Sequence, residues 1–478
     1  MANNKKLVER VTSRDVDFAK WYTDLCVEAE LMSYSSVQGF IIYRPYGYAI
    51  WEQIQNYLNN EFKRTNHENV YLPLVIPESL FQKEKDHIEG FAPETAIVTT
   101  TGKQDLAEKL IIRPTSEVLF AKHYSEIINS YRDLPKKYNQ WCSVVRWEKT
   151  TRPFLRGKEF LWQEGHTVHA TAEEAKKETL DMLEVYKKMG DNLLAIPFVT
   201  GQKTEREKFA GAEATYSIEA LMHDGKALQA GTSHYFGDGF AKAFDISFQD
   251  KDNKISYGYQ TSWGVTTRLI GALIMVHGDD EGLVLPPNVA PIQVVVIPIG
   301  NSKKVLNMTK KLNTKLSKSG IRYLIDDSDK RPGWKFSEYE MKGIPLRIEF
   351  GERDLENNQL SVFKRNTREK LSFNLENTNV VKEIKNMLNI IHEEMLQAAI
   401  NNLENNIRVA KTYEEFKKYL DLGGYVKMSI SGDKAEEIIK NETGATARII
   451  PFDEKLITDV CPVTKEKAKY TILFARAY

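Results

Sequence analysis

The sequence predicts an α+β chain with a large antiparallel-sheet domain, a small α/β domain and a compact α+β C-terminal segment. Residues 110–287 consist mostly of strand-like stretches separated by turn residues, which favours an antiparallel sheet. After Pro286 and Pro287 the pattern changes to strand, helix, strand, the βαβ arrangement of a parallel sheet. A last compact segment ends in "TILFARAY". We therefore expect domains at 1–288, 289–400 and 401–478.

Length and composition agree with this division and exclude several classes of protein. A chain of 478 residues corresponds to about three domains. Its 66 basic and 66 acidic residues cancel, so any nucleic-acid contact must be a local patch. No signal-like N-terminal run and no stretch of about 18 apolar residues is present, so we expect a cytoplasmic protein without a membrane span. Cys26, Cys142 and Cys461 are far apart, which fits a reducing compartment.

The first clear elements are a helix and an extended stretch. Apolar residues at mostly helical spacing predict a helix over 47–63, followed by the extended "NVYLPLVIP". Pro73 in this stretch cannot donate to a ladder, so it indicates an edge or a bulge. An incidental edge proline and a specific interface role are equally compatible with it.

A mixed face is predicted in "EFLWQEGH". In a strand, Phe160, Trp162, Glu164 and His166 project from one side. A solvated face would not carry two large aromatics, and a core face would not bury unpaired charge, which costs several kcal/mol. The face therefore indicates a binding site. The alternative is a half-buried strand in which the carboxylate and the imidazole simply pair.

Arg146 and Arg268 are candidate phosphate-binding residues. Arg146 and Glu148 should share one face of a strand that pairs with the mixed face, and the basic loop between the two strands carries Arg156 and Lys158. A guanidinium fixed on a strand suits a phosphate clamp, although a basic loop is usually a solvated surface hairpin. Arg268 falls in the first turn of an apolar helix, capped by Thr266 or Thr267, where a cation is disfavoured unless a phosphate or a nearby acid compensates.

Two further stretches supply polar groups of the same kind. In "RPTSE", Thr115 and Glu117 share a face and suit an ammonium group, and "LQAGTSHYF" brings Gln229, Thr232 and His234 to a strand end. The sequence contains no GxxxxGK[ST] loop and no HExxH motif. Nucleotide binding would therefore take place on the antiparallel sheet.

These motifs together resemble a known family. Arg146-x-Glu148 with its loop resembles motif 2 of the class II aminoacyl-tRNA synthetases, "GVTTRLIG" resembles motif 3, and the helix with "YLPLVIP" resembles the dimer-forming motif 1. The stretches "GFAPE", "RPTSE", "RPFLRGKEFLWQEGH", "LQAGTSH" and "YQTSWGVTTR" are similar to prolyl-tRNA synthetases of the archaeal and eukaryotic-like form. The similarity covers nearly the whole chain. It implies a class II catalytic domain followed by an anticodon-binding domain and a C-terminal domain.

The resemblance implies a homodimer that activates L-proline with ATP and Mg²⁺ and transfers it to tRNA(Pro). Arg146 and Arg268 would be catalytic, with Arg146 holding the α-phosphate and the proline carboxylate. Glu148 and Phe160 would bind adenine, and Arg156 and Arg268 the outer phosphates. The remaining ATP contacts implied are Gln229, which would also meet Mg²⁺, Thr232 and Thr266. The implied proline contacts, besides Arg146, are Phe91, Glu94, Thr115, Glu117, Trp162, Glu164, His166, His234 and Ser262.

The βαβ domain resembles the class IIa anticodon-binding module, with "RPGWKFSEYEMKGIPLRIEFGERD" as its distinguishing stretch. The resemblance makes Phe336, Glu340, Arg347 and Lys364 candidates for stacking on and reading exposed anticodon bases. Alternatively, Arg347 and Glu349 simply pair with each other.

The sequence departs from the family in its tail and its central interval. Many relatives end in a zinc-binding module, but Cys461 is the only cysteine after Cys142 and no histidine follows His392, so we expect no zinc. Gly157 and Lys158 replace more usual residues, which predicts weaker loop contacts to ATP. The interval between His166 and Gly258 is too short for the bacterial editing insertion, so we expect appreciable alanine activation.

Two other functions fit parts of the pattern. A class II ligase for another small amino acid, such as threonine or serine, would use the same chemistry, but the expected lack of a cysteine near the pocket argues against a threonine-type zinc site. A catalytically inactive, synthetase-like RNA-binding regulator would have lost its phosphate clamps, whereas Arg146, Glu148 and Arg268 are all present.

Overall fold

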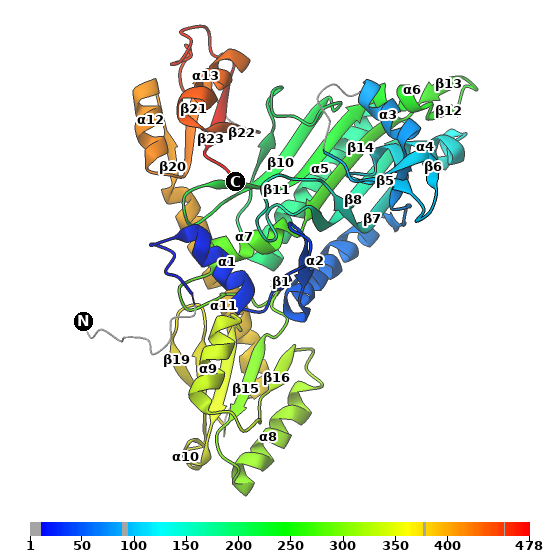
Figure 1. Cartoon of the computed structure of the whole chain (residues 1–478). Coiled ribbons are helices and arrows are strands. Elements are labelled where there is room, and N and C mark those ends of the chain that lie inside the picture. Colours follow the sequence, from blue (N-terminus) through cyan, green and yellow to red (C-terminus); the bar gives the residue numbers. More distant parts are fainter. Residues whose placement is uncertain (1–10, 88–93, 376–378, 454) are drawn as a thin grey trace.

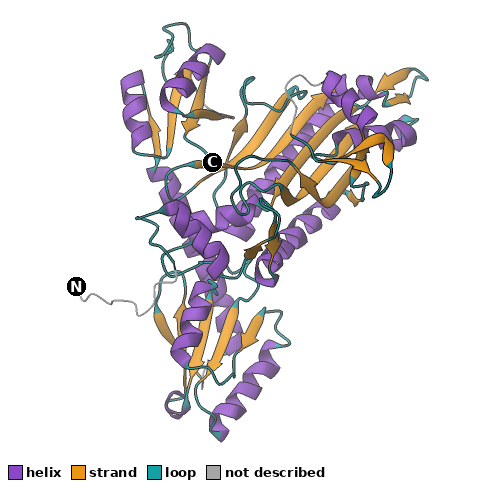
Figure 2. Cartoon of the chain, in the orientation of Figure 1, coloured by secondary structure: helices purple, strands orange, loops and turns teal. Residues whose placement is uncertain are grey.

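The computed structural model describes residues 11–87, 94–375, 379–453 and 455–478. It shows a domain built on a large sheet, an α/β lobe below it and a C-terminal lobe beside the sheet (Figure 1). Helices and strands alternate in both smaller lobes, while long strands dominate the large one (Figure 2). Among the described residues, no helix combines the length and the apolar character needed to cross a bilayer.

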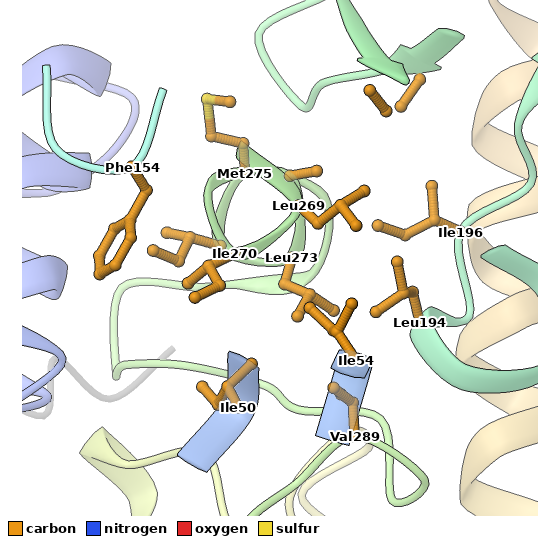
Figure 3. Close-up of a cluster of buried hydrophobic side chains, with 14 of the residues drawn as sticks. Ile50, Ile54, Phe154, Leu194, Ile196, Leu269, Ile270, Leu273, Met275 and Val289 are labelled. Carbon is orange, nitrogen blue, oxygen red and sulfur yellow. The ribbon is translucent and has the colours of Figure 1, made fainter. Parts of the chain in front are cut away.

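The first described elements form a mainly helical layer that packs against the large domain. It comprises α1 (Phe18–Glu28), the hairpin of β1 (Met32–Tyr34) and β2 (Ile41–Tyr43), and α2 (Pro45–Arg64), close to the helix that the apolar spacing predicts. Ile50 and Ile54 of α2 face the apolar helix α7 (Arg268–His277) (Figure 3). Leu269, Ile270 and Leu273 fill this core, so α7 is buried, as its composition predicts.

A small three-stranded sheet flanks the large one. Its strands are β4 (Val75–Pro77), β5 (Ile97–Thr100) and β6 (Asp105–Ile112), in the order β4-β6-β5, with α3 (Glu78–His87) and α4 (Glu117–Ile127) beside them. Pro73 lies in the connection between β3 (Glu68–Asn69) and β4. It therefore interrupts no ladder, which removes the conflict that its position in an apolar run raised.

The large sheet is antiparallel at its centre, which confirms the predicted fold class. In this domain its strands follow the order β9-β10-β11-β14-β8-β7-β3, and among these described strands β7 and β3 form the one parallel pair. Helix α5 (Ala172–Met189) packs against β11 and β14 and continues into the short π-helix η2 (Gly190–Leu194). The strands are β7 (Lys136–Val145), β8 (Glu159–His169), β9 (Val199–Gln202), β10 (Ala214–Leu221), β11 (Ala227–Gly237) and β14 (Tyr259–Thr266). Between β11 and β14 the chain forms α6 (Gly239–Phe244), β12 (Ser247–Gln249) and β13 (Ile255–Tyr257), and the short helix η1 (Tyr131–Asp133) precedes β7.

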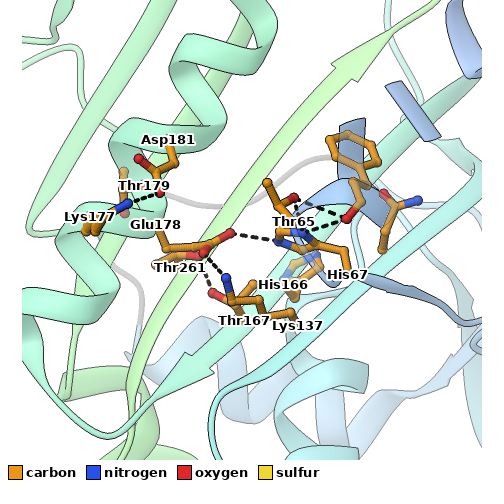
Figure 4. Close-up of polar contacts among 12 residues, drawn as sticks. Thr65, His67, Lys137, His166, Thr167, Lys177, Glu178, Thr179, Asp181 and Thr261 are labelled. Carbon is orange, nitrogen blue, oxygen red and sulfur yellow. Dashed lines mark hydrogen bonds and ion pairs between the residues drawn. The ribbon is translucent and has the colours of Figure 1, made fainter. Parts of the chain in front are cut away.

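A buried polar cluster joins α2, β7 and α5 (Figure 4). Glu178 of α5 accepts from His67 Nε2 at 2.7 Å and from Lys137 Nζ at 2.5 Å. Thr65 contacts the other ring nitrogen of His67 at 2.9 Å. The carboxylate therefore holds the end of α2 and strand β7 to the helix behind the sheet.

The α/β lobe contains the predicted βαβ unit. Strands β15 (Val294–Pro298) and β16 (Tyr323–Ile325) are parallel and are connected by α8 (Lys303–Leu316). The sheet order is β16-β15-β17-β18-β19, with β18 and β19 antiparallel. The remaining elements are α9 (Pro332–Met341), β17 (Leu346–Phe350), α10 (Glu352–Glu356), β18 (Gln359–Lys364) and β19 (Lys370–Asn374).

The long helix α11 (Val380–Asn405) leads to the C-terminal lobe, and the boundary expected at residue 400 falls inside it. The lobe contains β20 (Ile407–Val409), α12 (Tyr413–Asp421), β21 (Tyr425–Ile430), α13 (Asp433–Thr443), β22 (Thr446–Pro451) and β23 (Tyr470–Ala475). Its strands follow the order β20-β21-β23-β22, and β22 pairs with β9, with Ile450 opposite Gln202. The lobe therefore extends the same sheet that carries the site.

Candidate active site

One cavity collects nearly all of the predicted site residues. It has a volume of about 280 Å³ and lies on the face of the sheet formed by β8, β14, β11 and β10. Arg146 and Arg268 both line it, as a shared phosphate site requires. The predicted residues in its lining are Thr115, Glu117, Arg146, Glu148, Arg156, Phe160, Trp162, Glu164, His166, Gln229, Thr232, His234, Ser262, Thr266 and Arg268.

The mixed face of β8 forms one wall of this cavity. Phe160, Trp162, Glu164 and His166 all line it, as the strand alternation predicts. His166 Nε2 also donates to Glu164 Oε2 at 3.0 Å, so the pairing considered as an alternative exists as well. The two interpretations are compatible because the pair sits inside the cavity.

At the acidic end of the cavity, the Glu164 carboxylate accepts hydrogen bonds from neutral donors. Glu164 Oε1 accepts from Ser116 Oγ at 2.5 Å and from Gln140 Nε2 at 2.8 Å. Burial acts to raise the pKa of Glu164, but the hydrogen bond and charge of His166 outweigh it and the pKa is lowered. Glu164 is therefore an anion, which suits an ammonium ligand. Next to it, at the start of α4, the Thr115 hydroxyl donates to Glu117.

His234 differs from His166 in its environment. Burial, followed by the charge of His166, lowers the pKa of His234 to about 3, so its imidazole is neutral. Thr215 Oγ1 contacts its Nδ1 at 2.9 Å. His234 can thus take part in hydrogen bonds without adding charge to the acidic end.

Arg146 enters the cavity from just beyond a strand end. Strand β7 ends at Val145, so Arg146 and Glu148 are not strand residues as predicted, although Arg146 N still donates to the carbonyl of Lys158 at 2.8 Å. Its Nε donates to the Pro114 carbonyl at 3.0 Å. The guanidinium lies 5.5 Å from the ring centre of Phe160. These contacts fix the group while leaving the rest of its N–H donors for a ligand.

Arg268 occupies the opposite end in a strongly cationic setting. Of the two predicted capping residues, Thr267 occupies the N-cap position of α7 without a side-chain capping hydrogen bond, and the Arg268 backbone N–H donates to Thr266 Oγ1 at 3.0 Å. The Arg268 guanidinium donates to the carbonyls of Leu155 and Gln229 at 3.1 and 3.2 Å. Burial and then the charges of Arg156 and Arg146 lower the pKa of Arg268 to about 10. Within the described ranges no carboxylate forms an ion pair with these three arginines, but the charge of Glu219 is close enough to act on Arg268 and to raise its pKa, so the alternative of a nearby acid is met in part. The cluster suits an anion.

Of the two residues in the predicted proline loop, only Glu94 is among the described residues. Phe91 falls outside the described residues. Glu94 is placed beside the cavity, in an adjoining surface cleft that Arg146, Glu148 and Arg156 share. There its carboxylate lies 3.5 Å from Lys149 Nζ. Its part in proline binding stays a prediction.

Sequence reasoning missed part of the cavity. Lys203, Glu207 and Phe209, from the connection between β9 and β10, line it together with Thr215. The stretch "KTEREKFAGAEA" reads as an ordinary charged loop. Only the position of β9 beside β10 brings it over the site, and nothing in the local pattern specifies that strand order.

The expectation that no cysteine lies near the pocket is wrong. Cys142 stands opposite Trp162 in the β7–β8 ladder and accepts from the indole Nε1 at 3.2 Å. Its Sγ lies 3.6 Å from Glu164 Oε1. Burial and the charge of Glu164 raise the pKa of this thiol to about 12, so it is protonated. In the described part of the chain, no group of three or more His, Cys, Asp or Glu residues forms a metal cluster.

Three of the four anticodon candidates, Phe336, Glu340 and Arg347, meet on one face of the sheet of the α/β lobe, and Lys364 projects from the other face. Arg347 is buried between the rings of Phe336 and Phe363, at 4.2 and 4.3 Å, and pairs with Glu349 at 2.7 Å. The alternative pairing is thus observed, and Glu340 is a second partner at 2.9 Å. Lys364 is also buried and pairs with Glu394 at 2.6 Å. Base reading by Arg347 or Lys364 would require these pairs to open, and the roles of all four stay predictions.

An antiparallel sheet with arginines at one end of a cavity and carboxylates at the other is the arrangement of a class II aminoacyl-tRNA synthetase. Residues 99–277 match the family model of the tRNA synthetase class II core domain (G, H, P, S and T), and residues 293–387 match the anticodon binding domain. Residues 413–478 match the prolyl-tRNA synthetase C-terminal domain.

The proline--tRNA ligase of Onion yellows phytoplasma (strain OY-M) is 60% identical over 473 residues, 99% of each chain. The proline--tRNA ligase of Clostridium novyi (strain NT) is 57% identical over the full length of both chains. The chain therefore belongs to the prolyl-tRNA synthetase family, which confirms the resemblance seen in the sequence.

Proposed function

We propose that this protein activates L-proline with ATP to form prolyl-adenylate and transfers the prolyl group to tRNA(Pro). The observation that carries this proposal is the cavity in which Arg156 and Arg268 lie at one end, the anionic Glu164 lies at the other, and Arg146 lies between them. ATP supplies the negative charge for the first end, and the proline ammonium supplies the positive charge for the second.

The first step brings two anions together, because the proline carboxylate attacks the α-phosphorus. Arg146 lies between the acidic end and the other arginines, so it can hold both the carboxylate and the α-phosphate. Arg156 and Arg268 hold the outer phosphates, which leave as pyrophosphate. Fixed cations of this kind lower the barrier through positioning and electrostatics and need no acid or base.

The rest of the cavity binds the neutral parts of the substrates. Phe160 provides a ring face for adenine, with Glu148 beside it for the adenine amino group. Trp162 supplies an apolar wall for the pyrrolidine ring, with His234 and Ser262 beside it. Thr232 and Thr266 offer hydrogen bonds to ATP. Mg²⁺ prefers oxygen ligands, and the Gln229 amide and the Glu207 carboxylate both line the cavity. The ion would add positive charge around the triphosphate.

We also propose that the protein acts as a cytoplasmic homodimer whose α/β lobe binds the anticodon. The segment between β3 and β4 exposes Tyr71 and Leu74, with 70% and 44% of their surface accessible, and this supports a partner surface on the predicted dimer-forming motif. Light scattering of the purified protein tests the dimer. Footprinting of tRNA(Pro) with variants of Phe336 and Glu340 tests the anticodon contact.

Pyrophosphate exchange with each amino acid in turn, with and without tRNA, tests the function. We expect proline-dependent exchange in the absence of tRNA and charging of tRNA(Pro) when it is added. Exchange that responds better to threonine or serine would favour the ligase alternative. Binding of tRNA without exchange for any amino acid would favour the inactive regulator.

A further inference from the structure

A buried ion cluster links the C-terminal lobe to the cavity. Lys203, directly after β9, lines the cavity and donates Nζ to Glu219 Oε1 at 2.7 Å. The other carboxylate oxygen, Oε2, accepts from Arg448 Nε at 3.0 Å and Nη2 at 2.9 Å. Arg448 belongs to β22 of the C-terminal lobe, and all three side chains are buried. The C-terminal lobe thus supplies one of the two cations that share Glu219.

The cluster lies at the phosphate end of the cavity. Glu219 stands opposite Gln229 in the β10–β11 ladder, and the Gln229 carbonyl accepts from Arg268. Two cations share one carboxylate, so the cluster keeps a net positive charge next to Arg268. An ammonium carries three N–H donors, and only one of those of Lys203 is used by Glu219. No other group among the described residues accepts a hydrogen bond from Lys203 Nζ, so two donors remain for an anion.

A second contact fixes the same stretch from the same lobe. Thr204, the residue after Lys203, donates Oγ1 to Glu436 Oε2 of α13 at 2.8 Å. The β22–β9 ladder ends at Gln202, immediately before Lys203. Backbone pairing and two side-chain contacts from the C-terminal lobe therefore determine where Lys203 lies.

We propose that Lys203 is a further ATP-binding cation and that Arg448 is its positioning residue, so that the C-terminal lobe completes the phosphate site. This inference rests on the proposed function of the cavity. With Arg448 present, Glu219 divides its charge between two cations and Lys203 can bind a phosphate oxygen. Without Arg448, the carboxylate pairs with Lys203 alone and the positive charge at this end falls by one.

The test uses the full-length chain with Lys203→Met, Arg448→Met and Arg448→Lys. Proline-dependent pyrophosphate exchange gives KM separately for ATP and for proline, and inhibition by adenosine reports binding without phosphate. Loss of one charge-assisted hydrogen bond predicts an increase of about 10- to 100-fold in the ATP KM for Lys203→Met. The proline KM and the adenosine inhibition constant should stay within about twofold of wild type. Arg448→Met should raise the ATP KM less, and the double variant should be no worse than Lys203→Met alone.

Arg206→Met is the matched control, because Arg206 lies in the same loop and reaches the C-terminal lobe through Glu437, at 3.6 Å, without lining the cavity. It should keep a wild-type ATP KM. An unchanged ATP KM in Lys203→Met, or equal increases for ATP, proline and adenosine, would overturn the inference while an active wild type leaves the proposed function intact. Arg448→Lys keeps the charge that shares Glu219, so its ATP KM should stay near the wild-type value. If Arg448→Met does not fold, Arg448→Gln, which removes the charge, decides the positioning step. A raised ATP KM in that variant supports the step, and a wild-type value refutes it.

Discussion

Glu164 and His166 project from the same face of β8, and the imidazole Nε2 donates to the carboxylate Oε2 at 3.0 Å inside the cavity. The pair explains how a carboxylate with only 2% of its surface exposed stays ionised, since His166, Ser116 and Gln140 together offset the cost of burial. The same arrangement leaves an anion facing the space that the proline ammonium would occupy. The Glu164 carboxylate would therefore serve both recognition of the amino acid and the hydrogen bonds that hold β8 in place.

Glu164→Gln should weaken proline binding selectively. The amide removes the charge that meets the ammonium but keeps the shape of the side chain, so we expect the proline KM to rise about 10- to 100-fold, with the ATP KM unchanged. Exchange kinetics with each substrate varied separately provide the measurement. Glu148→Gln is the reciprocal variant, and it should raise the ATP KM instead. Equal effects of Glu164→Gln on both substrates would contradict the assignment.

Arg146→Ala should nearly abolish proline-dependent pyrophosphate exchange. The guanidinium lies at the junction of the two ends, and removing a donor aimed at developing charge costs about 10²- to 10³-fold or more in rate. The alanine variant loses the contact from Nε to the Pro114 carbonyl but keeps the hydrogen bond from the backbone N–H of residue 146 to the Lys158 carbonyl, so the fold should survive, as a melting curve close to wild type would show. Near-normal exchange by a folded variant would remove Arg146 from the reaction.

The sequence predicted the residues on the main strand of the site better than those that other strands bring beside it. Strand alternation placed Phe160, Trp162, Glu164 and His166 on one wall, because a period of two is a local property. Lys203 and Cys142 were missed because their proximity depends on which strands are neighbours, and that order arises from long-range pairing. The joining of β22 to β9 brings together segments far apart in the sequence, and no local pattern specifies it.

Glu178→Gln should destabilise the protein in a pH-dependent way. Burial raises the pKa of Glu178, but His67 and then Lys137 outweigh it and lower the value to about 2, from an ordinary 4.5. A lowered carboxyl pKa adds stability that is fully present above about 4.5 and is lost as the pH falls towards 2. Removing one partner of a buried pair costs about 3–5 kcal/mol at neutral pH, and the difference from wild type should shrink below pH 4.5.

Denaturant unfolding of both proteins across that range measures this effect. Glu184→Gln is the control on the same helix, because its pair with Lys188, at 3.6 Å, is exposed. It should change the unfolding free energy by less than about 1 kcal/mol at every pH. A pH-independent difference between wild type and Glu178→Gln would contradict the ion-pair explanation.

Glu436→Gln should stabilise the protein above neutral pH. Burial is the main cause that raises the pKa of Glu436 to about 7, and its Oε1 finds no hydrogen-bond partner in the part of the chain that the structure describes. A raised carboxyl pKa favours the folded state fully below the ordinary value of 4.5, and this contribution is lost as the pH rises through 7. Glutamine stays neutral, so melting temperatures should be higher than wild type at pH 8 and similar or lower at pH 5. Glu437→Gln, on the adjacent exposed side chain, should show no such crossover.

Alanine should be activated at an appreciable rate. The chain between His166 and Gly258 forms α5, η2 and strands β9 to β13 of the same domain, which leaves no room for an inserted hydrolytic domain there. The wall at Trp162 can lose contacts to a smaller side chain but cannot exclude it, so discrimination should be about 1–3 kcal/mol, or roughly 10- to 200-fold. The ratio of kcat/KM for proline and alanine in pyrophosphate exchange measures it. A ratio above about 10⁵ without extra ATP hydrolysis would show that the pocket rejects alanine by a clash or an unpaired polar group.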